Sequence, residues 1–415
     1  MLYFTLIMFF LAVTAHFRGP ISTRASAPWF FISWLPGELP WLFAFVQMVT
    51  MSVCFLLSKS VGLKEVCSFF IGVVTFVIWF RLNSKTWLAG PALKTALRDA
   101  LGVNFESTLL TNMSVASPPV IHKRDWLNPF LYRRSGIERL QNISYGEAER
   151  NRLDIYRTVK PYQHTLCRPV VLHIHGGAWV IGHKHQQAQP LLKYLAQNGW
   201  ICVDINYRLA PRDRYPDCLI DVKKAIVWVK ENIQNYGGDP DFISITGGSA
   251  GGHLCALAAL TANNPEFQPG FEENDTGVQA VVSVYGVYDF TNHHGDGSMM
   301  RNFLEKYVMP PTFLEHPGGW KSVSPLFHIG DVYPPMFIIH GDKDCVVPVE
   351  QARNFVQALK QKNSAPVIYA ELHGAQHGFD LFHSVRTEFH IEAVATFLHY
   401  CYAHHQSTET VSMKT

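Results

Sequence analysis

Hydrophobic residues dominate the N-terminal part of the chain, where they form long stretches without a polar face. Leu39 to Leu57 carries no charge, and Val66 to Phe80 is apolar up to Arg81. Because a helix needs about 20 apolar residues to cross a bilayer, the first stretch is predicted to span a membrane, and the second to do so with a few flanking residues. Met1 to Phe17 is a third apolar stretch, intermediate in length between a signal-peptide core and a short span.

Charged and aromatic residues around these stretches predict an orientation. Trp29, Trp34 and Trp41 suit the interfacial belt of a membrane protein. If all three stretches span, basic residues gather on one side, namely Arg18, Arg24, Arg81, Lys85, Lys94 and Arg98, against Lys59 and Lys64 on the other. The positive-inside rule then places the C-terminal domain in the cytoplasm, and the same side is favoured with only two spans. The chain is therefore expected to be a multi-pass integral membrane protein.

A connecting region follows from 91 to 135. Ala92 to Leu101 has a short amphipathic pattern, and Ser117-Pro118-Pro119 interrupts the segment after it. Aromatic and apolar residues then stand among basic ones: Lys123, Arg124, Trp126, Phe130, Leu131, Tyr132, Arg133 and Arg134. This composition suits either a segment at a membrane surface or a linker packed against the C-terminal domain.

From Ile137 onward, short apolar runs alternate with helical patterns. Helix 217 to 235 has apolar residues at helical spacing and stops at Tyr236-Gly237-Gly238-Asp239-Pro240. The expected strands are Ile137 to Ser144, Leu153 to Tyr156, Val170 to Ile174, Ile201 to Asn206, Ile243 to Thr246, Val278 to Tyr285, Met336 to His340 and Val367 to Leu372. Such alternation predicts an α/β domain, a mostly parallel eight-stranded sheet with helices on both faces. The expected divisions are 1–90 (membrane region), 91–135 (linker or cap), 136–405 (α/β domain) and 406–415 (polar tail).

Composition excludes some classes of function. The chain has 415 residues, 48% of them hydrophobic, enough for a full core and for more than one domain. Its net charge of +2 comes without a basic run, so a nucleic-acid partner is not expected. Eight cysteines show no C-x-x-C spacing, which favours a reducing compartment. The twenty histidines include neighbouring pairs but no H-E-x-x-H motif, so no metal or cofactor is predicted.

A glycine-rich turn around one serine is the first chemical signal in the α/β domain. Gly247-Gly248-Ser249-Ala250-Gly251 follows an apolar strand, precedes a helical pattern and fits G-x-S-x-G. That pattern is typical of the nucleophile elbow, which holds a serine hydroxyl above a sheet at a helix N-terminus. Taken alone, it is equally typical of a plain strand-to-helix loop, because five-residue patterns recur by chance.

Candidate partners for Ser249 lie further along the chain. A serine hydroxyl needs a base to take its proton and a carboxylate to orient that base. Asp342 and Asp344 follow an apolar strand, at the sheet edge where α/β sites form, and His377 lies in a glycine-flanked loop after the last strand. The order serine, acid, histidine is that of α/β-hydrolases. The turn His175-Gly176-Gly177-Ala178-Trp179 also follows a strand and can aim N–H groups outward, as an oxyanion hole requires.

Several motifs together resemble one family, the hormone-sensitive-lipase-like carboxylesterases. They are His-Gly-Gly-Ala-Trp at 175–179, Asn-Tyr-Arg-Leu-Ala-Pro at 206–211 with Tyr215-Pro216, Gly238-Asp239-Pro240, Gly-Gly-Ser-Ala-Gly-Gly at 247–252, His-Gly-Asp-Lys-Asp at 340–344 and His377-Gly378-Phe379. The similarity covers roughly Ile137 to Tyr400. One departure is Ala178, where many members have a third glycine; here the chain resembles the formamidase and prenylcysteine-methylesterase branches.

The resemblance implies an α/β-hydrolase fold and a serine carboxylesterase or lipase that works without a cofactor. It implies Ser249 as nucleophile, His377 as base and Asp344 as acid, since the family places its acid just before the turn to Val347-Pro348. Asp342 is then a turn residue, and Asp289 is a third choice and more simply a cap. For the oxyanion hole it implies the N–H groups of Gly177, Ala178 and Ala250, with Gly176 in reserve.

The expected function is a membrane-anchored esterase that cleaves carboxylic esters through an acyl-enzyme. The alternatives are an acyltransferase, thioesterase or deacetylase that uses the same three residues on a membrane lipid or glycan, and a non-catalytic hydrolase-fold receptor. The segment Phe290 to Pro335 carries apolar side chains that suit either an acyl pocket or ordinary core packing: Met299, Met300, Phe303, Leu304, Tyr307 and Phe313.

Overall fold

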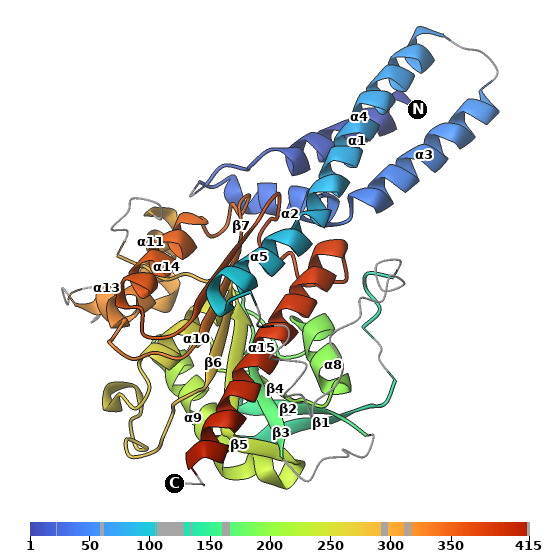
Figure 1. The fold of residues 1–415 in the computed structure, drawn as a ribbon. Coiled ribbons are helices and arrows are strands. Elements are labelled where there is room, and N and C mark those ends of the chain that lie inside the picture. The colour runs from blue at the N-terminus through green and yellow to red at the C-terminus, as the bar shows by residue number, and fades with distance from the viewer. Residues whose placement is uncertain are drawn as a thin grey trace.

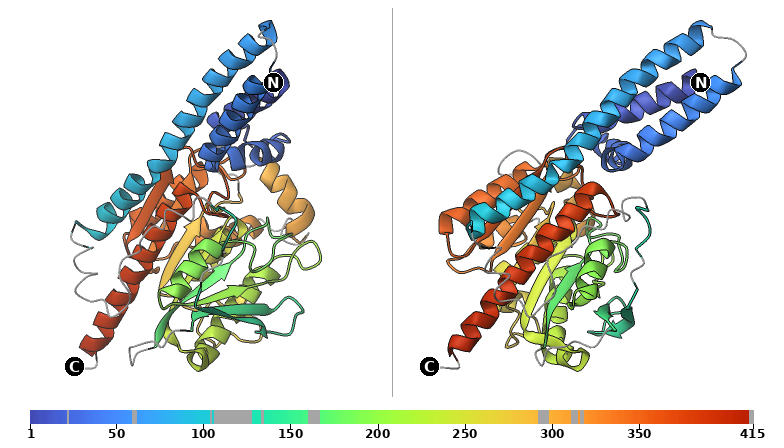
Figure 2. Two further views of the ribbon diagram at one scale, coloured as in Figure 1. Left: turned by 90° about the vertical axis from the view of Figure 1, so that its right-hand side faces the viewer. Right: turned by 45° about the vertical axis from the view of Figure 1, so that its right-hand side comes forward.

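A helical rod and an α/β domain make up the chain in the computed structural model (Figure 1). The structure describes residues 1–21, 23–58, 62–103, 105, 128–132, 135–159, 167–291, 298–310, 315 and 318–412. The rod extends away from one end of the domain, and the C-terminus lies at the opposite end (Figure 2).

The α/β domain is built on one eight-stranded sheet with the order β1-β2-β4-β3-β5-β6-β7-β8. The strands are β1 (Ile137–Ser144), β2 (Arg152–Thr158), β3 (Arg168–Ile174), β4 (Ile201–Ile205), β5 (Gly238–Gly248), β6 (Ala280–Val284), β7 (Met336–Gly341) and β8 (Val367–Leu372). The pairs β1–β2 and β2–β4 are antiparallel, and all the others are parallel. This confirms the predicted sheet. Strand β5 begins earlier than predicted because Gly238, expected in a turn, pairs with Arg168 of β3.

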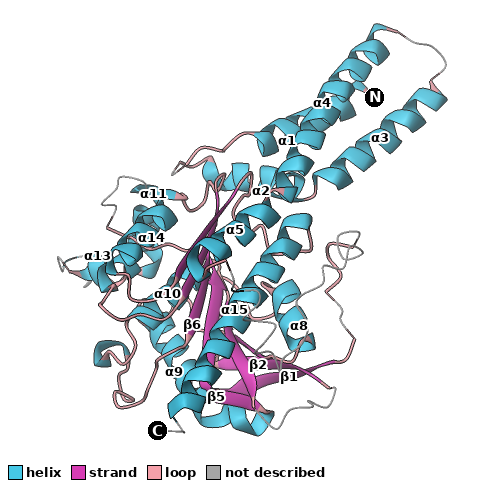
Figure 3. Cartoon of the chain, in the orientation of Figure 1, coloured by secondary structure: helices cyan, strands magenta, loops and turns pink. Residues whose placement is uncertain are grey.

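Helices cover both faces of the sheet (Figure 3). On β3, Val170 and Leu172 belong to one buried cluster, with residues of α9 (Asp217–Asn232), α10 (Ala250–Leu260) and α14 (Glu350–Lys362). Val171 belongs to the other cluster, with residues of α5 (Ala89–Leu101), α8 (Gln189–Gln197) and α15 (Val385–Ser412). The alternation follows from the strand's period of two and places β3 in the middle of the core.

Shorter helices complete the domain: η1 (Ile233–Tyr236), η2 (Pro265–Phe267), α11 (Ser298–Phe303), the π-helical η3 (Leu304–Val308), α13 (Gly319–Ser322) and η4 (Pro325–His328). Within the segment expected to form an acyl pocket or core, Leu304 and Val308 pack into the cluster on the α9 and α10 side. Helix α15 continues to Ser412, so most of the segment expected to be a polar tail is helical.

The rod consists of α1 (Leu2–His16), α3 (Pro40–Leu57) and the larger part of α4 (Leu63–Trp87). Helix α3 and the continuous helical segment Leu63–Leu101 are long and apolar enough to cross a membrane, whereas α1 is shorter. Large apolar side chains on α3 and α4 are exposed, including Phe45 at 54% and Phe70 at 64%.

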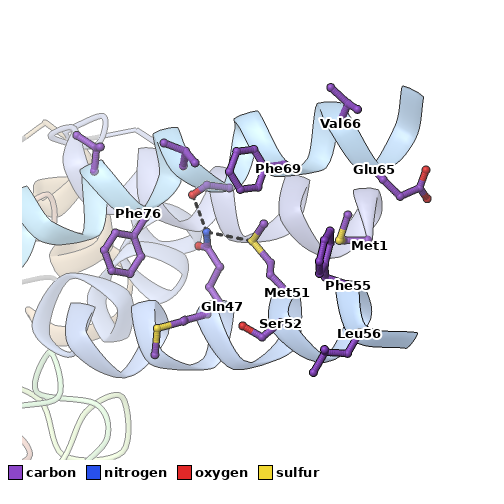
Figure 4. A pocket seen from close by; sticks show the side chains of 14 residues that line it. Met1, Gln47, Met51, Ser52, Phe55, Leu56, Glu65, Val66, Phe69 and Phe76 are labelled. Carbon is purple, nitrogen blue, oxygen red and sulfur yellow. Dashed lines mark hydrogen bonds between the residues drawn. The ribbon is translucent and has the colours of Figure 1, made fainter. Parts of the chain in front are cut away.

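A hollow of about 750 Å³ lies between α3 and α4 (Figure 4). Its walls are mainly apolar, and Gln47 is a buried polar residue in them. The Gln47 amide donates to Gly72 O at 2.8 Å and accepts from Trp79 Nε1 at 2.9 Å. The amide is therefore paired within the rod, as an apolar surrounding requires.

Helix α2 (Ser26–Glu38) was not predicted from the sequence. It lies across the base of the rod, between the rod and the α/β domain (Figure 1). Pro36 lies inside the helix, a position that usually ends one. Its exposed face carries apolar side chains, among them Phe31 at 71% exposed, so it lacks the polar and apolar alternation of a surface helix.

Part of the connecting region packs on the α/β domain. The Tyr132 hydroxyl donates to Leu381 O at 3.0 Å, and the Phe130 ring lies 5.6 Å from that of Phe382. Phe130 nevertheless remains 58% exposed. Other residues singled out earlier lie outside the described residues: Lys59, Ser117-Pro118-Pro119, Lys123, Arg124, Trp126, Arg133, Arg134 and Phe313. The neighbouring histidines His293 and His294 lie outside them as well.

Candidate active site

Ser249 lies at a sharp turn between β5 and α10. Its backbone has φ 58° and ψ −121°, a conformation that costs free energy in a non-glycine residue. Two hydrogen bonds hold the turn: Ser249 N–H donates to Val284 O at 2.9 Å, and His253 N–H donates to Ser249 O at 2.9 Å. The serine itself is half-buried. The predicted strand, turn and helix around Ser249 are thus present.

Gly251 allows the turn to approach the end of β3. A Cβ on Gly251 would lie 2.0 Å from Ile174 O and 2.9 Å from His175 O. Both are backbone atoms, which cannot rotate away as a flexible side chain could. The second glycine of the G-x-S-x-G pattern is therefore required by close backbone contact.

We expect Gly251→Ala to destabilise the protein by about 1–3 kcal/mol, because the new methyl group overpacks the elbow. The measurement is the unfolding midpoint of the full-length protein in detergent, with the fraction of serine that still reacts with a fluorophosphonate. Gly330→Ala is the matched control, because the nearest atom to a Cβ there is 3.9 Å away. Gly330→Ala is expected to change the free energy of unfolding by less than about 0.5 kcal/mol. Equal midpoints for the two variants would contradict the steric argument.

Asp344 and His377 meet at the carboxyl ends of β7 and β8. His377 Nδ1 lies 2.6 Å from Asp344 Oδ2, and the carboxyl group is fully buried. The N–H groups of Val346 and Val347 both donate to Asp344 Oδ1 at 2.8 Å. Burial alone would raise the pKa of Asp344, but the charge of His377 and the hydrogen bonds from His340 and His377 hold that pKa well below its usual range. The carboxylate is therefore ionised and can orient the imidazole.

The other two candidate acids lie elsewhere. Asp342 Oδ2 is 2.6 Å from His373 Nδ1, and its Oδ1 accepts from Gly374 N–H at 2.7 Å. Asp289 accepts from the N–H and the hydroxyl of Thr291, as a cap does. Of the three aspartates, the structure brings Asp344 to His377.

Tyr285 lies between His377 and the serine turn. Its ring centroid lies 4.5 Å from that of His377, and its ring is 2.7 Å from where a Cβ of Gly248 would be. Burial raises the pKa of Tyr285, so the phenol is neutral and its hydroxyl donates to Asp380. Its φ is 40°, unusual for tyrosine. Sequence reasoning did not select Tyr285 as a site residue, and its only signal was its place directly after β6.

The turn after β3 lies beside Ser249. A Cβ on Gly176 would be 3.2 Å from Ser249 Cβ, so the backbone of the two turns is in contact. Gly177 has φ 120° and Ala178 has φ 52°, which bends the chain sharply. The Gly176 N–H already donates to Gln187 Oε1 at 2.7 Å, so the reserve oxyanion donor has a partner.

The N–H groups of Gly177, Ala178 and Ala250 are those expected to form the oxyanion hole. Ala250 opens α10, so its N–H has no acceptor within the helix. For Gly177, Ala178 and Ala250, the described part of the chain shows no hydrogen-bond acceptor. Free N–H groups beside a serine hydroxyl are what stabilisation of an oxyanion requires.

The histidines near the turn have structural partners. The His175 ring stacks on Tyr207 with centroids 4.3 Å apart, and burial lowers the pKa of His175 to about 3. His173 Nδ1 contacts Asp204 at 2.7 Å. His253 Nδ1 accepts from the Trp179 indole at 3.1 Å and thereby fixes that side chain. Among the described residues, no group of three or more His, Cys, Asp or Glu side chains could hold a metal ion.

Comparisons with known proteins agree with this geometry. The family model BD-FAE matches residues 153–359. "Esterase LipQ" of Mycobacterium tuberculosis is 45% identical over 323 residues, which cover 75% of this chain and 76% of LipQ. "Probable carboxylic ester hydrolase LipM" of the same organism is 52% identical over 264 residues, which cover 63% of this chain. The match spans only 61% of LipM's own length.

A plant relative and two solved structures extend the comparison. "Probable isoprenylcysteine alpha-carbonyl methylesterase ICMEL1" of Oryza sativa subsp. japonica is 30% identical over 235 residues, 54% of this chain and 53% of the relative. The butyrate-bound esterase Est2 of Thermogutta terrifontis superposes with a TM-score of 0.53 at 27% identity, over 64% of this chain and 94% of Est2. A truncated carbohydrate esterase from gut microbiota gives 0.52 at 26% identity, over 63% and 96%.

The sheet, the serine elbow and the solved esterases define an α/β hydrolase fold. Within that class, the chain belongs to the carboxylic ester hydrolase family of LipQ and LipM, which confirms the resemblance to the hormone-sensitive-lipase-like carboxylesterases.

Proposed function

We propose that the protein is a membrane-anchored serine esterase that hydrolyses carboxylic esters. The observation that supports this most directly is the buried Asp344–His377 hydrogen bond of 2.6 Å, at the same sheet edge as the strained Ser249 turn. Tyr285 contacts the ring of His377 and approaches Gly248, next to Ser249. A base, its orienting acid and a serine hydroxyl are the groups that acyl transfer requires.

The reaction follows from these positions. His377 Nε2 takes the proton from Ser249 Oγ as the oxygen attacks the ester carbonyl carbon. The carbonyl oxygen becomes an oxyanion, which the N–H groups of Gly177, Ala178 and Ala250 stabilise. His377 then gives the proton to the departing alcohol, and the ester C–O bond breaks to leave an acyl-enzyme.

Water completes the cycle. His377 deprotonates the water molecule, whose oxygen attacks the acyl carbonyl, and the proton passes to Ser249 Oγ as the acid leaves. Asp344 remains ionised throughout and stabilises the imidazolium form of His377.

The test is hydrolysis of p-nitrophenyl butyrate by the full-length protein, together with labelling by a fluorophosphonate. We expect one molecule of butyrate for each p-nitrophenol and one label per chain, located at Ser249 by mass spectrometry. A label on another serine, or release of p-nitrophenol without butyrate, would refute the assignment. Transfer of butyrate to an added alcohol in preference to water would point to an acyltransferase.

Membrane anchoring is proposed through α3 and α4. Both helices are apolar and expose side chains such as Phe45 and Phe70. Such side chains are solvated poorly by water and well by lipid. Basic residues Arg81 and Lys85 lie on α4 toward the α/β domain, and Lys64 lies at the far end. This asymmetry supports a cytoplasmic α/β domain.

Labelling with a membrane-impermeant maleimide tests the orientation, in a parent that lacks the exposed Cys67. Gly62→Cys at the far end of the rod is expected to react in intact cells. Lys224→Cys on α9 is expected to react only after the membrane is permeabilised. The reverse pattern would invert the topology. Equal labelling of both in intact cells, or release of the protein by carbonate, would contradict a spanning anchor.

A further inference from the structure

Helix α2 is hydrogen-bonded to the loops that carry the proposed acid and base. Its Trp34 Nε1 donates to Gly378 O at 2.8 Å, directly after His377. The Cys345 thiol, directly after Asp344, contacts Ser26 O at 3.5 Å. The Phe30 ring is 6.0 Å from the His377 ring in an edge-to-face arrangement. A helix from the N-terminal part of the chain therefore contacts both catalytic loops.

Gln376 links the three elements through one side chain. Its Oε1 accepts from Cys345 N–H at 2.9 Å and from His377 N–H at 3.1 Å. Its Nε2 donates to Ser33 Oγ at 3.2 Å. Gln376 is 5% exposed and Ser33 is 3% exposed, so water does not replace these partners readily. The amide thus holds the acid loop and the base loop together and attaches both to α2.

Neighbouring contacts attach α2 and the rod to the same loops. Glu38, at the end of α2, forms a buried ion pair with Arg386 at the start of α15. Lys343, directly before Asp344, donates from Nζ to Ala15 O and His16 O at the end of α1. The position of the acid loop therefore depends on where the N-terminal helices lie.

The family model covers residues 153–359 and includes neither α2 nor Gln376. The matched segment therefore does not include the hydrogen bond between Gln376 and Ser33. Geometry at an active site matters strongly, since a displacement of about 1 Å can lower a rate about 100-fold. A side chain that fixes the distance between acid and base is thus able to control the rate without touching the substrate.

We propose that Gln376 and Ser33 are positioning residues, through which the N-terminal helices hold Asp344 and His377 in the geometry that hydrolysis needs. The proposal rests on the serine esterase function proposed above. It makes α2 part of the machinery of the active site as well as a connection to the rod.

The test uses full-length protein in lipid nanodiscs, with kcat expressed per chain labelled by a fluorophosphonate, so that misfolded protein does not count. Gln376→Met keeps the shape of the side chain but removes its hydrogen bonds, and kcat is expected to fall about 100-fold. Ser33→Ala removes the bond that Gln376 donates to α2, together with a long 3.5 Å bond from the Ser33 hydroxyl to Phe30 O within the helix, and kcat is expected to fall about tenfold. KM for p-nitrophenyl butyrate should change less than about twofold, because neither side chain is proposed to bind the ester.

The pH profile and a conservative variant separate positioning from general stability. In Ser33→Ala, the acid limb of kcat is expected to move to lower pH, because a displaced carboxylate favours the protonated imidazole less. Ser33→Thr keeps the hydroxyl and should restore kcat to within about threefold. Ser68→Ala is the matched control: Ser68 is buried in α4, bonds only Lys64 O among the described residues, and should leave kcat and pH profile unchanged.

A double-mutant cycle completes the test. Because the Ser33 bond acts through Gln376, the double variant should be no slower than Gln376→Met alone. Additive losses, or an unchanged kcat and pH profile in Ser33→Ala, would overturn the proposal. If the wild-type protein takes no label at Ser249 and cleaves no ester, the esterase function itself fails. Labelled, active protein with a normal Ser33→Ala variant refutes only the positioning role.

Discussion

Replacing Ser249 with alanine is expected to lower kcat for p-nitrophenyl butyrate by a factor of about 10⁴ or more. The substitution removes the oxygen that is proposed to form the acyl-enzyme, and neither His377 nor the proposed oxyanion donors can supply it. Ser249 has φ 58°, and alanine adopts that backbone conformation at a cost similar to that of serine, so the turn should keep its shape. The measurement is kcat from steady-state kinetics, together with loss of the fluorophosphonate label.

A serine on the same strand provides the control. Ser244 is fully buried in β5, and its hydroxyl donates to Val170 O at 3.0 Å, away from the proposed site. Ser244→Ala is expected to change stability by about 1 kcal/mol and kcat by less than about threefold. Near-normal turnover by Ser249→Ala would exclude Ser249 as the nucleophile, whatever the control shows.

Replacing Asp344 with asparagine is expected to lower kcat by about 10⁴, with little change in overall fold. The carboxylate accepts from His377 Nδ1, whereas an amide can present its NH₂ group there and stabilise the wrong imidazole tautomer. Because the pKa of Asp344 lies well below its usual range, the carboxylate stays ionised from pH 5 to pH 8. The loss should therefore be present at every pH in that range, which a pH profile of kcat measures.

Asp342→Asn is the matched control for the acid. Asp342 follows the same strand but contacts His373 and Gly374, so its loss should reduce kcat less than about threefold. A large loss in Asp342→Asn with a small one in Asp344→Asn would show that the acid had been assigned to the wrong aspartate.

The sheet was predictable because its inner strands are buried on both faces and therefore appear in the sequence as apolar runs between turn residues. All eight strands were found, and β1 and β8 have the predicted bounds. The serine elbow was predictable for a related reason. Close backbone contact requires a glycine at position 251, and that glycine is visible in the sequence as part of the G-x-S-x-G pattern.

The acid and the neighbours of the site depend on contacts that sequence does not display. Asp342 and Asp344 follow the same strand two residues apart, and spacing alone left both open. Their roles differ because the chain turns between them, one side chain reaching His373 and the other His377. Gln376 gave no signal, since two of its partners, Cys345 and Ser33, come from other elements far away in the sequence.

Helix α2 is a whole element that depends on contacts the sequence does not display. Sequence reasoning placed Trp34 in a membrane belt, as an interfacial tryptophan would be. In the structure its indole N–H donates to Gly378 O, a partner 344 residues away. A helix that buries one side on a distant part of its own chain and exposes apolar residues such as Phe31 has no polar and apolar alternation to reveal it. Pro36 and Gly37 add local signals against a helix.

The link between Ser33 and Gln376 has a consequence for biosynthesis. The two residues are 343 positions apart, and Glu38 and Arg386 are 348 apart. A ribosome adds about 5–20 residues per second, so α2 emerges tens of seconds before its partners exist. The ion pair that joins α2 to the start of α15 forms only after Arg386 has been synthesised. Helix α2 can therefore reach Gln376 and Arg386 only after all eight strands of the sheet have been synthesised.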